Sequence, residues 1–197
     1  MSADRDQHVE SAEQVEGKSE SLLVSLIKIV LIVVIIFGLS WILREFVFQA
    51  YEIPSGSMEE TIMTGDMVFA EKVSYNFCDV QVGDIVTFTD PNDDSRTLIK
   101  RVIAVGGQTV DINDEDGLVY VDGVALEEDY VIGLTYTLSN SDIEFPYTVP
   151  EGYIWVMGDN RENSQDSRYF GAVPLSSVEA HAVLIYWPLS DFGLLVD

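Results

Sequence analysis

The run of apolar residues from Leu22 to Leu43 limits most strongly what this chain can fold into. A single charge, Lys28, interrupts it, and as an α-helix its 22 residues would be roughly 33 Å long, enough to cross a hydrocarbon core of ~30 Å. A cleaved export signal has a basic leader and a shorter apolar stretch, whereas this leader is acidic. The sequence therefore predicts one membrane-spanning helix, with cleavage near the small residues Gly38 and Ser40 as the alternative.

The polar segment before this run, residues 1 to 21, carries six acidic residues against Arg5 and Lys18. It has almost no hydrophobic residues around which to fold, so we expect a disordered tail. Basic residues favour the cytoplasmic side of a membrane, and the lysine within the run lies close enough to its N-terminal end to snorkel to that interface. We therefore expect a cytoplasmic tail, a membrane helix over residues 22–43 and an extracytoplasmic domain over residues 44–197.

Composition excludes several classes of function. The 34 acidic and 10 basic residues give a formal net charge of −24, which repels nucleic acid phosphates, so we expect no nucleic acid partner. The single cysteine, Cys78, cannot form an internal disulfide and therefore indicates no particular compartment. The two histidines, His8 and His181, are too few for a multi-histidine site, and we expect no metal.

Beyond the apolar run the sequence is that of a β protein. Asp122-Gly123 predicts a two-residue hairpin turn, because both positions of such a turn favour positive φ. Acidic stretches at residues 90–94 and 111–117 predict loops. The second resembles a calcium-binding loop only superficially, because its glycine comes one position late and no glutamate closes it. Short alternating or apolar runs predict strands over residues 84–89, 98–105, 118–121 and 182–187.

The segment Ile53-Pro-Ser-Gly-Ser-Met58 places two hydroxyl groups, those of Ser55 and Ser57, soon after the apolar run. A serine hydroxyl is a weak nucleophile and needs an adjacent base, so catalysis here depends on which base the chain supplies. His181 is the one histidine expected on this side of the membrane. Without a base the segment would be an ordinary surface turn.

Lys100 is the candidate base. Because side chains alternate along a strand, Lys100 in a strand over residues 98–105 shares one face with Leu98, Val102 and Ala104. An amine in such an apolar setting loses its proton more readily, because burial disfavours the charged form. A solvated lysine at the end of a strand is the alternative.

Four segments of the chain resemble, in order, the signature motifs of bacterial type I signal peptidases. They are Pro54-Ser-Gly-Ser-Met-Glu59, Gly65-Asp-Met-Val68, Ile99-Lys-Arg-Val-Ile-Ala-Val-Gly106 and Gly158-Asp-Asn-Arg-Glu-Asn-Ser-Gln-Asp-Ser-Arg168. Four motifs in the family's order are highly specific. One position departs from the pattern, because Glu60 stands where the family usually has proline.

The resemblance implies a role for several residues. Ser57 would be the nucleophile and Lys100 the general base of a Ser-Lys dyad, while the Ser55 hydroxyl and the Ser57 backbone N–H would form the oxyanion hole. Ser164 would orient the lysine. Arg101 follows the lysine, as expected for the family. Four further residues match the family's structural ion-pair positions and could pair across a turn: Asp159, Arg161, Asp166 and Arg168.

The resemblance also implies a fold and an activity. The fold class would be mainly β, with an antiparallel β catalytic core, an inserted β cap near residues 107–150 and one preceding transmembrane helix. The activity would be that of a membrane-bound serine endopeptidase that removes N-terminal signal peptides from exported preproteins without a metal or cofactor. Expected partners are preprotein signal peptides, membrane lipid and the secretion translocon. The expected location is the cell membrane, with the N-terminus in the cytoplasm.

Other interpretations remain open at this level. A dedicated peptidase for pilins or other special substrates would use the same dyad, and an inactive anchored β-domain would act as a scaffold. A sortase-like transpeptidase would need Cys78, His181 and Arg168, which match no sortase motif. Relatives in the endoplasmic reticulum use histidine as the base, and Lys100 argues against that branch.

Overall fold

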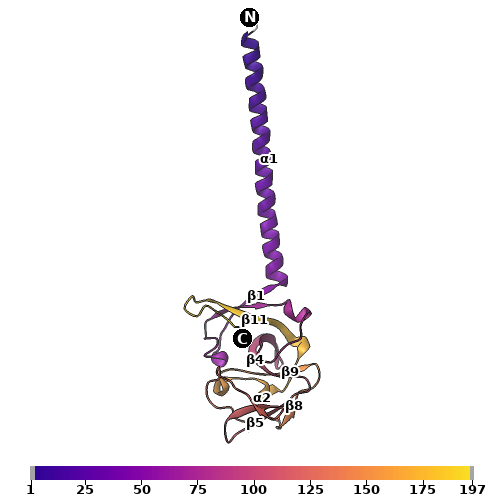
Figure 1. Ribbon diagram of the computed structural model, residues 1–197, viewed down its shortest axis with the longest axis vertical. Coiled ribbons are helices and arrows are strands. Elements are labelled where there is room, and N and C mark those ends of the chain that lie inside the picture. The colour runs from indigo at the N-terminus through magenta and orange to yellow at the C-terminus, as the bar shows by residue number, and fades with distance from the viewer. Residues whose placement is uncertain (1–2, 196–197) are drawn as a thin grey trace. The chain divides into compact units, whose positions relative to one another are not determined.

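Figure 1 shows the computed structural model of the protein, which describes residues 3–195. The chain divides into two compact units, Met1–Glu45 and Phe46–Asp197. Helix α1, Ala3–Phe46, makes up the first unit. Its segment Leu22–Arg44 has a mean hydropathy of 3.1 and exposes its apolar side chains. Among the described residues it is the one helix that is long and apolar enough to cross a membrane.

Helix α1 begins further toward the N-terminus than the sequence suggests. Residues 3–21, for which the sequence predicts disorder, continue the same helix. Once the apolar segment has formed a helix, each added residue gains a backbone hydrogen bond without a new nucleation step. The disorder expected for the tail is therefore absent from residues 3–21 of the structure.

The second unit is built on an eight-stranded sheet in the order β1-β2-β11-β3-β4-β9-β10, and β12 pairs with β11. Neighbouring strands are antiparallel throughout. The expected strands over residues 84–89, 98–105 and 182–187 are found as β3, β4 and β11. The strands are β1 Phe48–Glu52, β2 Met67–Glu71, β3 Ile85–Asp90, β4 Asp93–Val105, β9 Tyr153–Met157, β10 Val173–Pro174, β11 Val178–Trp187 and β12 Gly193–Leu194.

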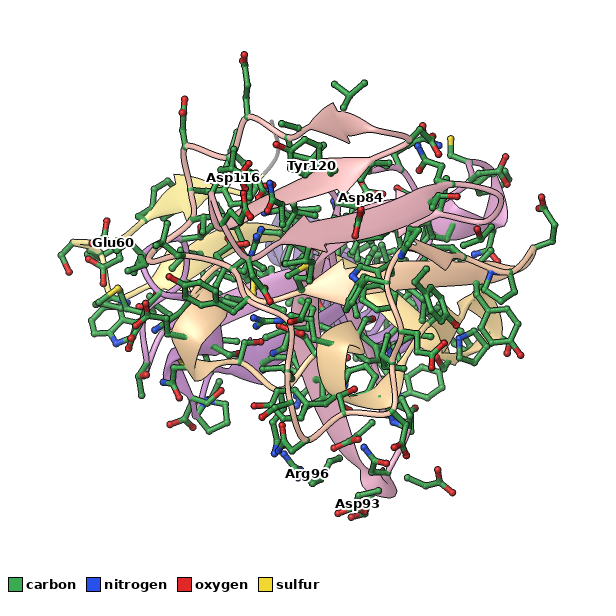
Figure 2. The ribbon with its side chains drawn as sticks, turned by 90° about the horizontal axis from the view of Figure 1, so that it is seen from below. Glu60, Asp84, Asp93, Arg96, Asp116 and Tyr120 are labelled. Carbon is green, nitrogen blue, oxygen red and sulfur yellow. The ribbon has the colours of Figure 1, made fainter. Side chains whose placement is uncertain are left out.

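A smaller antiparallel sheet, in the order β7-β6-β5-β8, is inserted between β4 and β9. Within this unit, β5 and β8 lie at the opposite end from β1 (Figure 1). The whole sheet falls inside residues 107–150, the interval for which an inserted cap is expected. On its surface the Tyr120 hydroxyl donates to Asp116 at 2.8 Å, and the two lie together in Figure 2. The strands are β5 Thr109–Asn113, β6 Leu118–Val121, β7 Val124–Ala125 and β8 Tyr147–Thr148.

The turn predicted at Asp122-Gly123 is confirmed, and two predicted loops are shorter than expected. Asp122 and Gly123 have φ values of 51° and 79°, and Val121 pairs with Val124 across them. The loop predicted over residues 90–94 is a two-residue turn, because Asp90 already pairs with Asp93. The loop predicted over residues 111–117 is strand as far as Asn113. In both places strand pairing overrides the low β propensity of acidic residues.

Three clusters of buried hydrophobic residues stabilise the second unit. One contains Ile53, Met58 and Ile62, which flank Ser57 in the sequence and anchor its segment against β2 and β11. Another packs Trp155 of β9 against residues of the smaller sheet. Short helices connect the strands: η1 Gly56–Met58, η2 Ser74–Asn76, η3 Arg161–Asn163, α2 Ser167–Phe170 and η4 Leu175–Ser177.

Candidate active site

Ser57 and Lys100 lie in direct contact. Lys100 on β4 donates from Nζ to the Ser57 Oγ at 2.7 Å and to the carbonyl of Ile99 at 2.8 Å. Ser57 is 6% exposed and Lys100 is 3% exposed. A serine hydroxyl within hydrogen-bond distance of a buried amine is the arrangement of an activated nucleophile.

The environment of Lys100 favours its neutral form. Burial lowers the pKa of Lys100 to about 8, against the carboxylates of Asp166, Asp159 and Asp90, which raise it. The effect of burial is the largest of these, because an ammonium that is removed from water loses its hydration. The ammonium form still predominates at neutral pH, but the neutral amine that can accept a proton is far more populated than it would be in a solvated lysine.

Helix η1 fixes the position of Ser57. The following residue, Met58, is fully buried, and its carbonyl accepts the N–H of Ile62 at 2.8 Å. Before the helix, Ile53 is bonded through its N–H and its carbonyl to Asp66 and Gly65 at 2.9 and 2.8 Å. The nucleophile therefore stands on a short turn that is anchored on both sides.

A cleft of about 290 Å³ opens onto the dyad. Ser55 is exposed and lines it with Ser57. Arg96 lies with Asp93 near the tip of the β3–β4 hairpin (Figure 2) and contributes to the wall. The complete lining is Ser55, Ser57, Arg96, Leu98, Lys100, Glu162, Asn163, Ser164, Gln165 and Tyr169.

Ser164 lies in the same cleft, and its Oγ is buried without a hydrogen-bond partner among the described residues. The backbone of Gly158 packs closely against it. A Cβ added at Gly158 would lie 2.3 Å from the Ser164 Oγ and 2.4 Å from the Ser57 carbonyl oxygen. Only glycine therefore fits between these two serines. A buried hydroxyl without a partner costs free energy, which makes Ser164 a candidate to bond a reacting group.

The ion-pair residues are all buried, but they do not pair as the sequence suggests. Arg168 does pair with Asp166, at 2.9 Å from Nε. Asp159 instead binds Arg101 through two hydrogen bonds of 3.0 and 2.8 Å. The expected pairing across a turn therefore holds for Asp166 and Arg168, whereas Asp159 is directed toward β4 and binds the arginine that follows Lys100.

The partner of Arg161 is Glu128, in the segment that follows β7. Arg161 Nη1 donates to Glu128 Oε2 at 3.0 Å and to the Thr135 hydroxyl at 2.7 Å. In the same segment Tyr130 packs over Arg101, with 3.8 Å from the guanidinium carbon to the ring centre. Sequence reasoning missed Glu128, Thr135 and Tyr130, since no motif surrounds them.

The residues of a sortase-like site are not brought together. Arg168 forms an ion pair with Asp166. Cys78 is exposed and lines a different cavity with Tyr75, and His181 lies 3.9 Å from Glu71 and 3.8 Å from Asp84. Among the described residues no group of three or more histidines, cysteines and carboxylates has the arrangement of a metal site. Glu60, which replaces the family's proline, is exposed at the surface (Figure 2).

Comparison with known proteins identifies the family of this chain. Residues 25–187 match the family model described as "Signal peptidase, peptidase S26". The chain is 42% identical to a probable signal peptidase I-1 of Synechocystis, over 80% of both chains. It is 33% identical to signal peptidase I of Aquifex aeolicus, over 74% of this chain and 78% of that one. A signal peptidase I structure from Enterococcus faecalis is 35% identical, covers 53% of this chain and 97% of its own, and has a TM-score of 0.44. The chain belongs to the signal peptidase I family, peptidase family S26.

Proposed function

We propose that this chain is a membrane-bound serine endopeptidase that removes N-terminal signal peptides from exported preproteins by a Ser-Lys dyad. The observation that carries the proposal is the 2.7 Å hydrogen bond between the buried Lys100 Nζ and the Ser57 Oγ. Relatives named signal peptidase I support the choice of substrate. The cleft that opens onto the dyad offers a place for an extended peptide.

The reaction begins with neutral Lys100, which accepts the hydroxyl proton of Ser57 while the Ser57 Oγ attacks the scissile carbonyl carbon. The tetrahedral intermediate then collapses, the peptide C–N bond breaks, and Lys100 returns the proton to the leaving amine. Water then attacks the ester carbonyl carbon of the acyl-enzyme while Lys100 accepts a proton from it. The ester C–O bond breaks, and Lys100 passes that proton to the Ser57 Oγ, which restores the hydroxyl. Among the side chains of the protein, only Ser57 and Lys100 change their covalent bonds.

Three further groups would stabilise the reaction. The Ser55 hydroxyl and the Ser57 N–H would donate to the oxygen on which negative charge develops, and donors placed before the reaction are effective because they need no reorganisation. The buried Ser164 hydroxyl would bond Lys100 once that amine is protonated, which gives its unsatisfied oxygen a partner.

The apolar segment of α1 would anchor the enzyme. In this arrangement residues 1–21 are cytoplasmic, residues 22–43 span the cell membrane and residues 44–197 form the extracytoplasmic peptidase domain, with the smaller sheet as a cap over about residues 107–150. A nucleophile 14 residues beyond Leu43 stays within roughly 50 Å of the bilayer even in an extended chain. Signal peptides held in the membrane or in the translocon would therefore be accessible to it.

The direct test is cleavage of a secretory precursor by the full-length protein in detergent, with the cut mapped by mass spectrometry. Ser57→Ala and Lys100→Ala should each reduce the rate by on the order of 10⁴-fold or more, because dyad members act as a unit. Ser176→Ala and Lys72→Ala are matched controls, since both residues line a different cavity, and both variants should cleave at the wild-type rate.

The outcomes of this test separate the alternatives. Substantial turnover by either dyad variant would contradict the mechanism. Cleavage of pilin-like precursors alone would indicate a dedicated peptidase. A wild-type protein that cleaves no precursor would indicate a scaffold.

A further inference from the structure

Asn160, between β9 and η3, binds the backbone on both sides of the nucleophile. Its Nδ2 donates to the carbonyl of Gly56 at 3.0 Å, and its backbone N–H donates to the carbonyl of Ser57 at 3.2 Å. Nδ2 also lies 3.4 Å from the Glu59 Oε2. A carbonyl and a carboxylate can only accept, which orients the Asn160 amide with its nitrogen toward both of them.

The Gly56 carbonyl and the Ser57 N–H belong to one planar peptide group, so they turn together. Gly56 has no side chain to restrict this rotation. The N–H of Glu59 also donates to the Gly56 carbonyl, at a longer 3.3 Å. The shorter bond from Asn160 therefore contributes most to the direction in which the Ser57 N–H points.

The loop that carries Asn160 is itself fixed by the segment after β7. Next to Asn160, Arg161 is 3% exposed and is bonded to Glu128, to Thr135 and to the carbonyl of Gly158. The N–H of Ile132 donates to the carbonyl of Asp159 at 3.1 Å, and Ile132 forms a β-bridge with Asn160. The backbone of Asn160 therefore cannot move away from Gly56 without breaking these contacts.

We propose that Asn160 is a positioning residue for the reaction. Its side-chain amide keeps the Gly56–Ser57 peptide group turned so that the Ser57 N–H faces the scissile carbonyl oxygen. The proposal rests on the proposed peptidase function, in which that N–H is an oxyanion donor. Asn160 contacts the backbone of Ser57 and not the reacting bond, so it acts through Ser57.

Asn160→Ala tests the proposal, because it removes the side-chain amide and retains the backbone N–H. A lost oxyanion donor costs on the order of 10²–10³-fold, so a misdirected one should reduce kcat by about 10- to 100-fold while KM stays within about twofold. Affinity for a peptide boronate, which forms a tetrahedral adduct with Ser57, should fall by the same factor as kcat/KM. The acid limb of the pH profile should not move, since Lys100 is unaltered.

Two more variants complete the experiment, with every rate expressed per folded molecule from thermal melts. Asn160→Asp places a carboxylate against two acceptors and should lose more activity than Asn160→Ala. Asn76→Ala removes a comparable bond, from an exposed amide to the carbonyl of Lys72 at 3.3 Å, and should leave all parameters unchanged.

The possible failures are distinguishable. The wild-type assay alone tests the peptidase function, and a wild type that cleaves no precursor would overturn that function. An active wild type with an equally active Asn160→Ala variant would overturn only the positioning role. A rise in KM at unchanged kcat, or boronate affinity that does not fall with kcat/KM, would overturn it as well.

Discussion

At the scale of one residue, the protonation of Lys100 decides whether Ser57 can be activated. Burial lowers the pKa of Lys100 to about 8, so the neutral amine prevails only above that pH. We expect kcat/KM for a signal-peptide substrate to rise with pH along a limb centred near 8, the pKa of Lys100, and to level off at higher pH. The measurement is kcat/KM from roughly pH 6 to 10, because its acid limb reports the essential base of the free enzyme.

The matched control for this profile is Lys72→Ala, which removes an amine that lines a different cavity and should not move the acid limb. A limb centred at about 10.4, the pKa of a solvated lysine, would show that Lys100 is not the base. If the acid limb moved in Lys72→Ala, the titrating amine would be Lys72 and not Lys100.

At the scale of elements, one buried ion pair joins the segment after β7 to the loop after β9. Glu128→Ala leaves the Arg161 guanidinium buried without its carboxylate, which should lower the free energy of unfolding by about 3–5 kcal/mol. Urea denaturation of the full chain measures this. Glu127→Ala is the matched control, because Glu127 is the adjacent, exposed glutamate and its removal should change the stability by less than about 0.5 kcal/mol. If both substitutions changed the free energy of unfolding equally, the Glu128–Arg161 ion pair would make no specific contribution to stability.

At the scale of the whole molecule, the proposed function requires the peptidase domain to lie outside the cytoplasm. Protease added to intact cells should digest the domain after Leu43 and leave the tail before Leu22 protected, as detected with a tag at each end. In permeabilised cells both tags should be lost. Protection of the C-terminal tag in intact cells would reverse the orientation and contradict the proposed function.

The sequence by itself determined the features that repeat locally. An apolar run of sufficient length predicts a helix wherever it occurs, and α1 contains it. Alternation along β4 predicted that Lys100 shares a face with Leu98, Val102 and Ala104. Leu98 and Val102 pack in one cluster, but a register shift after Val102 places Ala104 in another. The Asp122-Gly123 turn followed from its two residues. The pairing of Ser57 with Lys100 came from the family's motifs, since the two are 43 residues apart and no local pattern joins them.

Only the tertiary structure decided which side chains meet across the loops. Glu128 is one of 34 acidic residues, and nothing in the sequence around it distinguishes it as the partner of Arg161. The two residues are 33 positions apart, and the path of the chain after β7 alone brings them together. Asn160 lies within a recognised motif, yet its bond to Gly56 spans 104 positions. Hydrogen bonds of this kind depend on the directions of two backbones, and these directions are fixed only when the sheet and its insertion have packed.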